Sequence, residues 1–259
     1  MKTIILCGGA GTRISGGDRT VKKEMVEIGG RPILWHIMKI FEGYNYRDFI
    51  LPLGYRGDLI RRYFLDYEVM NRDLSFTLGQ PNKPKFHDLN HESDWTLTLI
   101  DTGLEANKGA RIKQLDRYIH SGPFFVTYGD GLGNIDLGKL IAFHRGHGKI
   151  ATITGVRPSY QYGVMELAEN GCITGYEQYP RLDHWINAGF MLFERQLFDY
   201  LSEDNSLDLE NGALTQLAAE GQLMMYRHDG FWQSMDTFKD ALTLNQLWDT
   251  GTAPWKVWK

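Results

Sequence analysis

The order of apolar and polar positions predicts alternating strands and helices along the first half of the chain. Residues 3–7, 48–53 and 124–128 are apolar runs of strand length, and each is followed by a glycine. Apolar positions recur with a helical period over residues 31–42 and 59–67. Strands that alternate with helices are typical of a mostly parallel sheet covered by helices on both faces.

The rest of the chain continues this pattern with one interruption. Further strands are predicted at residues 74–78, 95–100, 150–156, 186–193 and 223–227, and further helices at 112–119, 136–147, 194–202, 210–220 and 237–248. Asn170-Gly171 lies between the runs 164–168 and 172–176, which predicts a β-hairpin. Residues 157–185 therefore form an expected insertion, and we expect it to build one wall of a pocket. With no linker in the chain, residues 1–259 are expected to form a single α/β domain with a mixed, mostly parallel sheet.

Composition narrows the function classes without choosing among them. The chain has 259 residues, 42% hydrophobic and 23% charged, which is sufficient for a packed core. A net charge of −4 argues against the broad basic face of a nucleic-acid-binding protein. The two cysteines, Cys7 and Cys172, form no disulfide framework or zinc motif. The short apolar run at the first strand is too brief for a signal peptide or membrane span, so we expect a cytoplasmic protein with no membrane partner.

A glycine-rich turn, Gly8-Gly9-Ala10-Gly11-Thr12-Arg13, follows the first strand directly. Glycines there let backbone N–H groups approach phosphate oxygens, and Arg13 can neutralise phosphate charge. An ordinary turn between a strand and a helix is an equally open interpretation. The spacing fits neither a dinucleotide fingerprint nor a P-loop.

Charged residues elsewhere could complete a phosphate site. Of Lys22 and Lys23, one could reach a bound triphosphate from its position just after the glycine turn, although a solvated loop is the alternative. Asp130 ends an apolar strand between two glycines, and Asp236 follows another apolar segment. If the two carboxylates meet, they could hold Mg²⁺ against phosphates. A helix cap is the alternative role for Asp236.

Several motifs together resemble one enzyme family over nearly the whole chain and in order. They are GGAGTR at 8–13, the lysine before MVEIGG, RPILWHIMK at 31–39, Asp101-Thr102-Gly103, Thr127-Tyr128-Gly129-Asp130-Gly131, Asn187-Ala188-Gly189-Phe190, FWQSMDT at 231–237 and Ala253-Pro254-Trp255-Lys256. The combination resembles the bacterial glucose-1-phosphate cytidylyltransferases. The resemblance implies a Rossmann-like nucleotidyltransferase core, Mg²⁺ dependence and a homo-oligomer. It also implies transfer of a cytidylyl group from CTP to glucose 1-phosphate.

The resemblance also assigns site residues. Those implied to bind the nucleotide are Leu6, Gly8, Gly9, Gly11, Thr12, Arg13, Lys23, Arg111 and Asp130, with Arg13, Lys23 and Asp130 catalytic. Those implied to bind the acceptor are Tyr128, Gly163, Glu177, Gln178 and Asn187. The implied metal ligands are Asp130 and Asp236. For Arg111, Gly163 and Asn187, a helix arginine, a strand-start glycine and a turn asparagine are the plainer alternatives.

Two departures separate this chain from the family pattern. Gln178 replaces a lysine that would face the sugar phosphate, while the neighbouring Glu177 is kept. Lys22 and Glu24 stand where the family usually has prolines. The alternatives are therefore the same transfer to a different sugar 1-phosphate or to a small polyol phosphate such as glycerol phosphate. A non-catalytic nucleotide-binding module is the third possibility, and the intact Arg13, Lys23, Asp130 and Asp236 argue against it.

Overall fold

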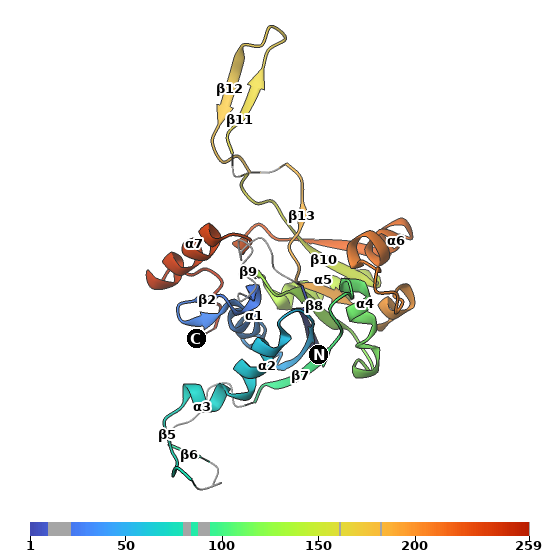
Figure 1. Ribbon diagram of the computed structural model, residues 1–259. Helices are drawn as coiled ribbons and strands as arrows, with labels where there is room; N and C mark the ends of the chain where they lie inside the picture. Colours follow the sequence, from blue (N-terminus) through green and yellow to red (C-terminus); the bar gives the residue numbers. More distant parts are fainter. Residues whose placement is uncertain (10–21, 80–83, 88–93, 161, 182, 259) are drawn as a thin grey trace.

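An eight-stranded mixed sheet forms the centre of the molecule (Figure 1). The computed structural model describes residues 1–9, 22–79, 84–87, 94–160, 162–181 and 183–258. The strands are β1 (Lys2–Leu6), β4 (Asp48–Leu53), β7 (Thr96–Asp101), β8 (Phe124–Tyr128), β10 (Ala151–Val156), β13 (Ile186–Asn187), β14 (Met191–Phe193) and β15 (Leu223–Arg227). Their order across the sheet is β15-β10-β14-β8-β1-β4-β7, with β13 also along β10. The pairs β1–β4, β1–β8, β4–β7 and β10–β15 are parallel. Strand β14 runs antiparallel to its neighbours β10 and β8. The predicted α/β fold with a mixed, mostly parallel sheet is confirmed.

Each face of the sheet carries its own hydrophobic core, because successive side chains of a strand point to opposite faces. In β1, Ile5 belongs to the core beneath α1 (Ile33–Glu42), α5 (Leu137–His147) and α7 (Phe238–Asp249). The next residue, Leu6, belongs to the other core. That second core is covered by α4 (Lys108–Lys113), the 3-10 helix η3 (Arg195–Tyr200), the π-helix η4 (Leu209–Leu214) and α6 (Thr215–Ala219).

Three small ribbons lie outside the main sheet, and the sequence pattern missed all of their strands except β5 because each has only two or three residues. The ribbons are β2–β3 (Glu27–Ile28 with Arg31–Pro32), β5–β6 (Leu74–Ser75 with Lys85–Phe86) and β9–β16 (Gly131–Gly133 with Trp232–Ser234). The remaining short elements are η1 (Lys23–Met25), α2 (Gly57–Leu65), α3 (Tyr67–Asn71) and η2 (Asp116–Tyr118). The β9–β16 pairing matters most for the site, because it joins the end of β8 to the segment before α7.

The predicted hairpin forms an arm that projects away from the sheet (Figure 1). Strands β11 (Val164–Leu167) and β12 (Ile173–Glu177) pair antiparallel, which confirms the hairpin. Gly171 takes a φ of +80° in its turn, a conformation that glycine adopts without strain. The arm exposes large apolar side chains, including Tyr162, Leu167 and Tyr176.

Two predicted strands differ from the structure. The strand at 74–78 is shorter than predicted: only Leu74–Ser75 (β5) forms there, outside the main sheet, and Phe76 and Leu78 are exposed. The strand at 186–193 is split into β13 and β14, because Gly189 and Phe190 take positive φ values of 76° and 44°. The break turns the chain under Tyr128, where a side chain at residue 189 would come within 3.0 Å of the tyrosine ring.

Predicted helices in the second half also shift. The helix at 112–119 is instead α4, which begins at Lys108, followed by η2. The helix at 210–220 begins as the π-helix η4.

His36 of α1 anchors the segment that follows α7. Its Nε2 lies 2.8 Å from the carbonyl oxygen of Ile28, and the indole N–H of Trp255 donates to its Nδ1 at 3.4 Å. The neutral ring with the proton on Nε2 satisfies both contacts, whereas a second proton on Nδ1 would face the Trp255 N–H. Burial lowers the pKa of His36 from 6.5 to about 4.

We predict that this histidine makes the protein sensitive to acid. The folded state resists protonation of His36 while the unfolded state accepts it, so the free energy of unfolding falls as the pH drops from 6.5 towards 4. The full effect is on the order of 3 kcal/mol. Urea unfolding across this range should show a shallower pH dependence in His36→Leu than in the wild type. The exposed His120, changed to Asn, serves as control, and equal slopes in the wild type and His36→Leu would contradict the assignment.

Candidate active site

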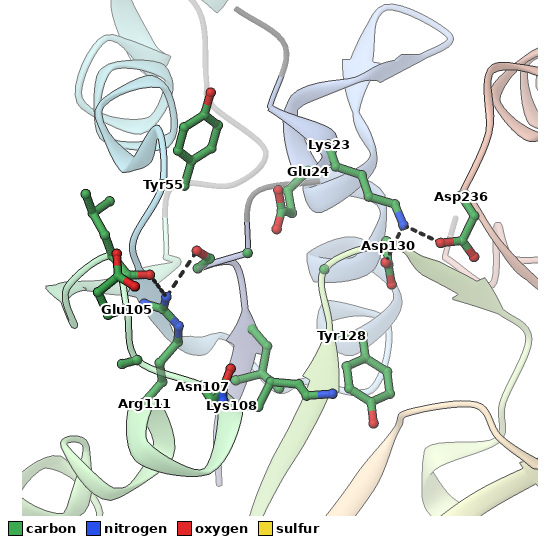
Figure 2. Close-up of a pocket in the computed structure, with 16 residues that line it drawn as sticks. Lys23, Glu24, Tyr55, Glu105, Asn107, Lys108, Arg111, Tyr128, Asp130 and Asp236 are labelled. Carbon is green, nitrogen blue, oxygen red and sulfur yellow. Dashed lines mark hydrogen bonds and ion pairs between the residues drawn. The ribbon is translucent and has the colours of Figure 1, made fainter. Parts of the chain in front are cut away.

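A cavity of about 770 Å³ opens at the carboxyl ends of β1 and β8 (Figure 2). Its described lining comes from the ends of strands, from the loops that follow them, and from η1 and α4. The lining residues are Leu6, Gly8, Gly9, Lys23, Glu24, Tyr55, Leu104, Glu105, Ala106, Asn107, Lys108, Arg111, Tyr128, Gly129, Asp130 and Asp236. Ligands of open α/β sheets bind at this edge, so the position favours a substrate site.

Lys23 lies between two carboxylates at one end of the cavity (Figure 2). Its Nζ is 2.7 Å from Asp130 Oδ2 and 2.8 Å from Asp236 Oδ1. Burial opposes the charged ammonium, but the two carboxylates outweigh it and raise the pKa of Lys23 above its usual value. The structure thus brings together the predicted signature lysine and both predicted metal ligands.

Backbone pairing fixes the two carboxylates relative to each other. Asp130 follows β8 directly, and the N–H of Met235 donates to the Asp130 carbonyl at 2.8 Å. Asp236 is therefore held one residue beyond this pairing. It is not the cap of α7: Thr237 is the N-cap, and Asp240 completes the capping box and also accepts from the Asp236 N–H at 3.0 Å.

Arg111 holds the opposite end of the cavity together. Its guanidinium donates to the carbonyls of Leu53, Gly103, Gly8 and Leu104 and to the Thr102 hydroxyl. A side chain at Gly8 would place its Cβ 2.3 Å from Arg111 Cζ, so residue 8 must be glycine for this packing. Arg111 therefore lines the cavity as predicted, and its hydrogen bonds connect the ends of β1 and β4 to the 102–104 loop. Gly11, Thr12 and Arg13 lie outside the described residues.

Tyr128 and Asn187, two of the predicted acceptor residues, lie in contact. The Asn187 amide donates to the Tyr128 hydroxyl at 2.9 Å, and that hydroxyl donates to Glu210. Lys108 lies 2.7 Å from the other Glu210 oxygen. Burial, together with the Glu210 carboxylate, raises the pKa of Tyr128 well above its usual value. The network keeps Tyr128 a neutral hydrogen-bonding group on the cavity wall.

Gly163, Glu177 and Gln178 lie on or beside the arm instead. None of the three is among the described residues that line the cavity, and Glu177 and Gln178 are exposed. The Tyr176 hydroxyl donates to Gln178 Oε1 at 2.7 Å and packs against Gly163. Because no described residue of the insertion lines this cavity, the expectation that it builds one wall of the pocket stays a prediction, as do the three acceptor assignments.

Two charged residues near the cavity were not predicted from the sequence, and two others were noted there without a structural role. Lys108 and Glu210 form the pair beside Tyr128, and no spacing in the sequence connects them. Lys22 and Glu24 flank Lys23, and both are buried. Burial raises the pKa of Glu24 to about 7, although the Lys22 ammonium opposes this shift. The two departures from the family prolines could have pointed to this pair.

Comparisons with known proteins give the chain its family. The family profile described as nucleotidyl transferase matches residues 2–251. Two curated relatives align over the full length of both chains: a Bacillus subtilis protein called "Probable glucose-1-phosphate cytidylyltransferase", 41% identical, and the glucose-1-phosphate cytidylyltransferase of Salmonella typhi, 39% identical. The chain belongs to the glucose-1-phosphate cytidylyltransferase family of nucleotidyl transferases. The predicted family and enzyme class are confirmed.

A solved structure agrees on the fold of this nucleotidyltransferase. HddC from Yersinia pseudotuberculosis superposes with a TM-score of 0.67 at 19% identity, covering 95% of this chain and 99% of that one. Among the described residues, no helix has the length and apolar character needed to cross a bilayer.

We predict that the adjacent lysines fail in different ways when changed to alanine. Lys22 is buried, donates to the Gly9 carbonyl at 2.7 Å and lies 3.2 Å from Glu24. Lys22→Ala leaves the buried Glu24 without its cation, so the free energy of unfolding should fall by about 3 kcal/mol. Lys23→Ala should instead lower kcat by roughly 10²–10³, the usual loss for a charge-stabilising group.

Pyrophosphate release and urea unfolding of both variants test this difference. A greater loss of kcat in folded Lys22→Ala than in Lys23→Ala would show that the two roles are exchanged.

Proposed function

We propose that this enzyme transfers the cytidylyl group of CTP to the phosphate of α-D-glucose 1-phosphate, giving CDP-glucose and pyrophosphate. The observation that carries the proposal is the Lys23 ammonium held between Asp130 and Asp236 at the end of a cavity at the strand termini. Relatives with 39–41% identity over the full length, named for this activity, support the choice of CTP and glucose 1-phosphate.

The transfer is an in-line displacement at the α-phosphorus. An oxygen of the acceptor phosphate forms the new P–O bond, the bond to the β-phosphate breaks, and pyrophosphate leaves with the electron pair. No covalent enzyme intermediate is required. This suits the site, because burial and the nearby Glu24 raise the pKa of Cys7 well above its usual value and keep it a thiol.

The residues of the chain act by positioning and by neutralising charge. Lys23 steadies the reacting phosphates, and Arg13 with the glycine turn receives the leaving pyrophosphate. Arg111 keeps the floor of the cavity in place beneath Gly8. Tyr128 and Asn187 offer the sugar a preformed pair of polar groups.

Asp130 and Asp236 fit the role of Mg²⁺ ligands. One oxygen of each already lies within 2.8 Å of a single cationic nitrogen, so both carboxylates can face one cation. Within the described residues no group of three or more His, Cys, Asp or Glu side chains could hold a metal ion. Mg²⁺ in nucleotide sites commonly takes one or two carboxylates and completes its shell with phosphates and water. When bound, Mg²⁺ would supply charge neutralisation to the phosphates.

Two further features bear on the partners. The exposed apolar side chains of the arm support a homo-oligomer, in which a second copy covers them. The neutral Gln178 supports an alternative acceptor, either another sugar 1-phosphate or a glycerol-type phosphate, because it cannot neutralise a phosphate as the family lysine would.

We predict that Asp130→Asn and Asp236→Asn each lower Mg²⁺-dependent turnover by roughly 10²-fold or more, because each removes a charged ligand. Initial rates of pyrophosphate release over a Mg²⁺ titration measure this effect. Asp249→Asn changes an exposed carboxylate at the end of α7 and serves as control. Near-normal rates in either folded site variant would remove that residue from the metal site.

We predict that the wild type uses glucose 1-phosphate efficiently and that Gln178→Lys gains little. Gln178 is exposed on the arm, and Tyr128 and Asn187 remain in place to bind the sugar. The measurement is kcat/KM with CTP for glucose 1-phosphate, other hexose 1-phosphates and glycerol phosphates, for both proteins. Poor use of every hexose phosphate beside good use of a smaller phosphate would overturn the glucose assignment and leave cytidylyl transfer standing.

A further inference from the structure

Glu24 places a buried carboxylate on the wall of the cavity. The residue is 6% exposed and lines the cavity, and Figure 2 shows its carboxylate pointing into the space between the two ends. Its Oε2 is fully buried and accepts no hydrogen bond within the described part of the chain. The Lys22 ammonium lies 3.2 Å from that oxygen but donates its hydrogen bond to the Gly9 carbonyl.

The wall of the cavity near the carboxylate is mostly apolar. Leu6 and the glycines at 8, 9 and 129 line the cavity around Glu24, and none of them carries a polar side chain. A Cβ at residue 129 would lie 2.6 Å from Glu24 Cγ, so the glycine there makes room for this side chain. A buried carboxylate with unused acceptor capacity is costly unless something donates to it. Among the described residues the Lys22 ammonium offsets this cost, and a hydroxyl of a ligand in the cavity would offset it further.

The position of Glu24 within the cavity selects the part of the nucleotide that it meets. In the proposed reaction the phosphates bind at Lys23, Asp130 and Asp236. Glu24 is the next residue after Lys23 in the chain. Glu24 also packs against Gly129, the residue before Asp130, so its carboxylate lies beside the phosphate end of the cavity. In a nucleoside triphosphate the ribose follows the α-phosphate directly, and the base lies beyond it. The ribose hydroxyls are therefore the hydrogen-bond donors of the nucleotide that lie nearest to the phosphates.

We propose that Glu24 accepts a hydrogen bond from a ribose hydroxyl of the bound nucleotide and makes the enzyme select ribonucleotides over deoxyribonucleotides. This inference rests on the proposed use of CTP. The Lys22 ammonium supplies the charge that keeps the carboxylate in place, and Gly129 provides the space. Glu24 is thus a specificity residue, and Lys22 is a positioning residue that acts through it.

A purely structural ion pair is the competing explanation. In that case Lys22 and Glu24 would only neutralise each other's charge within the protein and would not contact a ligand. A variant without either charge separates the two explanations, because the double change Lys22→Met with Glu24→Met leaves no unpaired buried ion. Glu24→Gln is the second variant, which keeps the shape of the side chain. Glu27→Gln, an exposed change three residues away, is the matched control.

The experiment compares kcat/KM for CTP, 2′-deoxy-CTP and 3′-deoxy-CTP, each with glucose 1-phosphate. In the wild type and in Glu27→Gln we expect CTP to be preferred over one deoxy analogue by roughly 10- to 100-fold, the effect of a hydrogen bond to a charged group. In the double variant that preference should fall to within about threefold, and Glu24→Gln should lie between. The efficiency with the deoxy analogue itself should change little.

Three results would overturn the proposal. They are a wild type that does not distinguish the three nucleotides, a folded double variant that keeps the wild-type preference, and an equal loss on all three nucleotides. The last would mark the pair as structural. If CTP is not turned over at all, the proposed reaction fails instead. Calorimetric binding of CTP and its two deoxy analogues to the same four proteins then still measures the contribution of Glu24.

Discussion

The meeting of Lys23 with Asp130 and Asp236 is the interaction on which the rest of the site depends. The two carboxylates lie 2.7 and 2.8 Å from the same Lys23 nitrogen, so their negative charges repel each other. The single Lys23 ammonium, whose side chain is one-tenth exposed, compensates both charges. Ion pairs with little solvent contribute little net stability, because desolvation offsets their attraction. The arrangement therefore needs support from elsewhere. The β9–β16 ribbon and the capping box of α7 provide it, since both fix the backbone at the carboxylates.

The electrostatic character of the cavity follows from this cluster. Lys22 and Lys23 are each paired with acids, Lys22 with Glu24 and Lys23 with Asp130 and Asp236. Arg111, by contrast, is bonded to carbonyl and hydroxyl oxygens. The proposed Mg²⁺ would be held by Asp130 and Asp236 and would leave the lysine for the phosphates.

Much of the fold could be predicted from the sequence because long apolar runs such as Phe124–Tyr128 form central strands wherever they occur. The position of Asp130 at the end of such a run was also readable. The contact between Asp130 and Asp236 was not, because it depends on a ribbon of three-residue strands with no periodic signal. The two roles of the adjacent lysines depend on burial, which no local pattern encodes. The residue roles came from the family resemblance. Neither the sequence pattern nor the resemblance predicted the contact between Glu210 and Lys108, because only the tertiary fold brings these residues together.

The long sequence separation of the cluster has a consequence for how the protein is made. Lys23 and Asp130 are 107 residues apart, whereas Lys23 and Asp236 are 213 residues apart. Chains begin to fold from the N-terminal side during synthesis, so the sheet around β1, β4 and β8 can assemble well before residue 236 leaves the ribosome. The second carboxylate arrives last, together with α7 and the Trp255 contact to His36. A chain interrupted in translation before this segment would carry the lysine and one aspartate, but it would lack both the second carboxylate and the packing of α7.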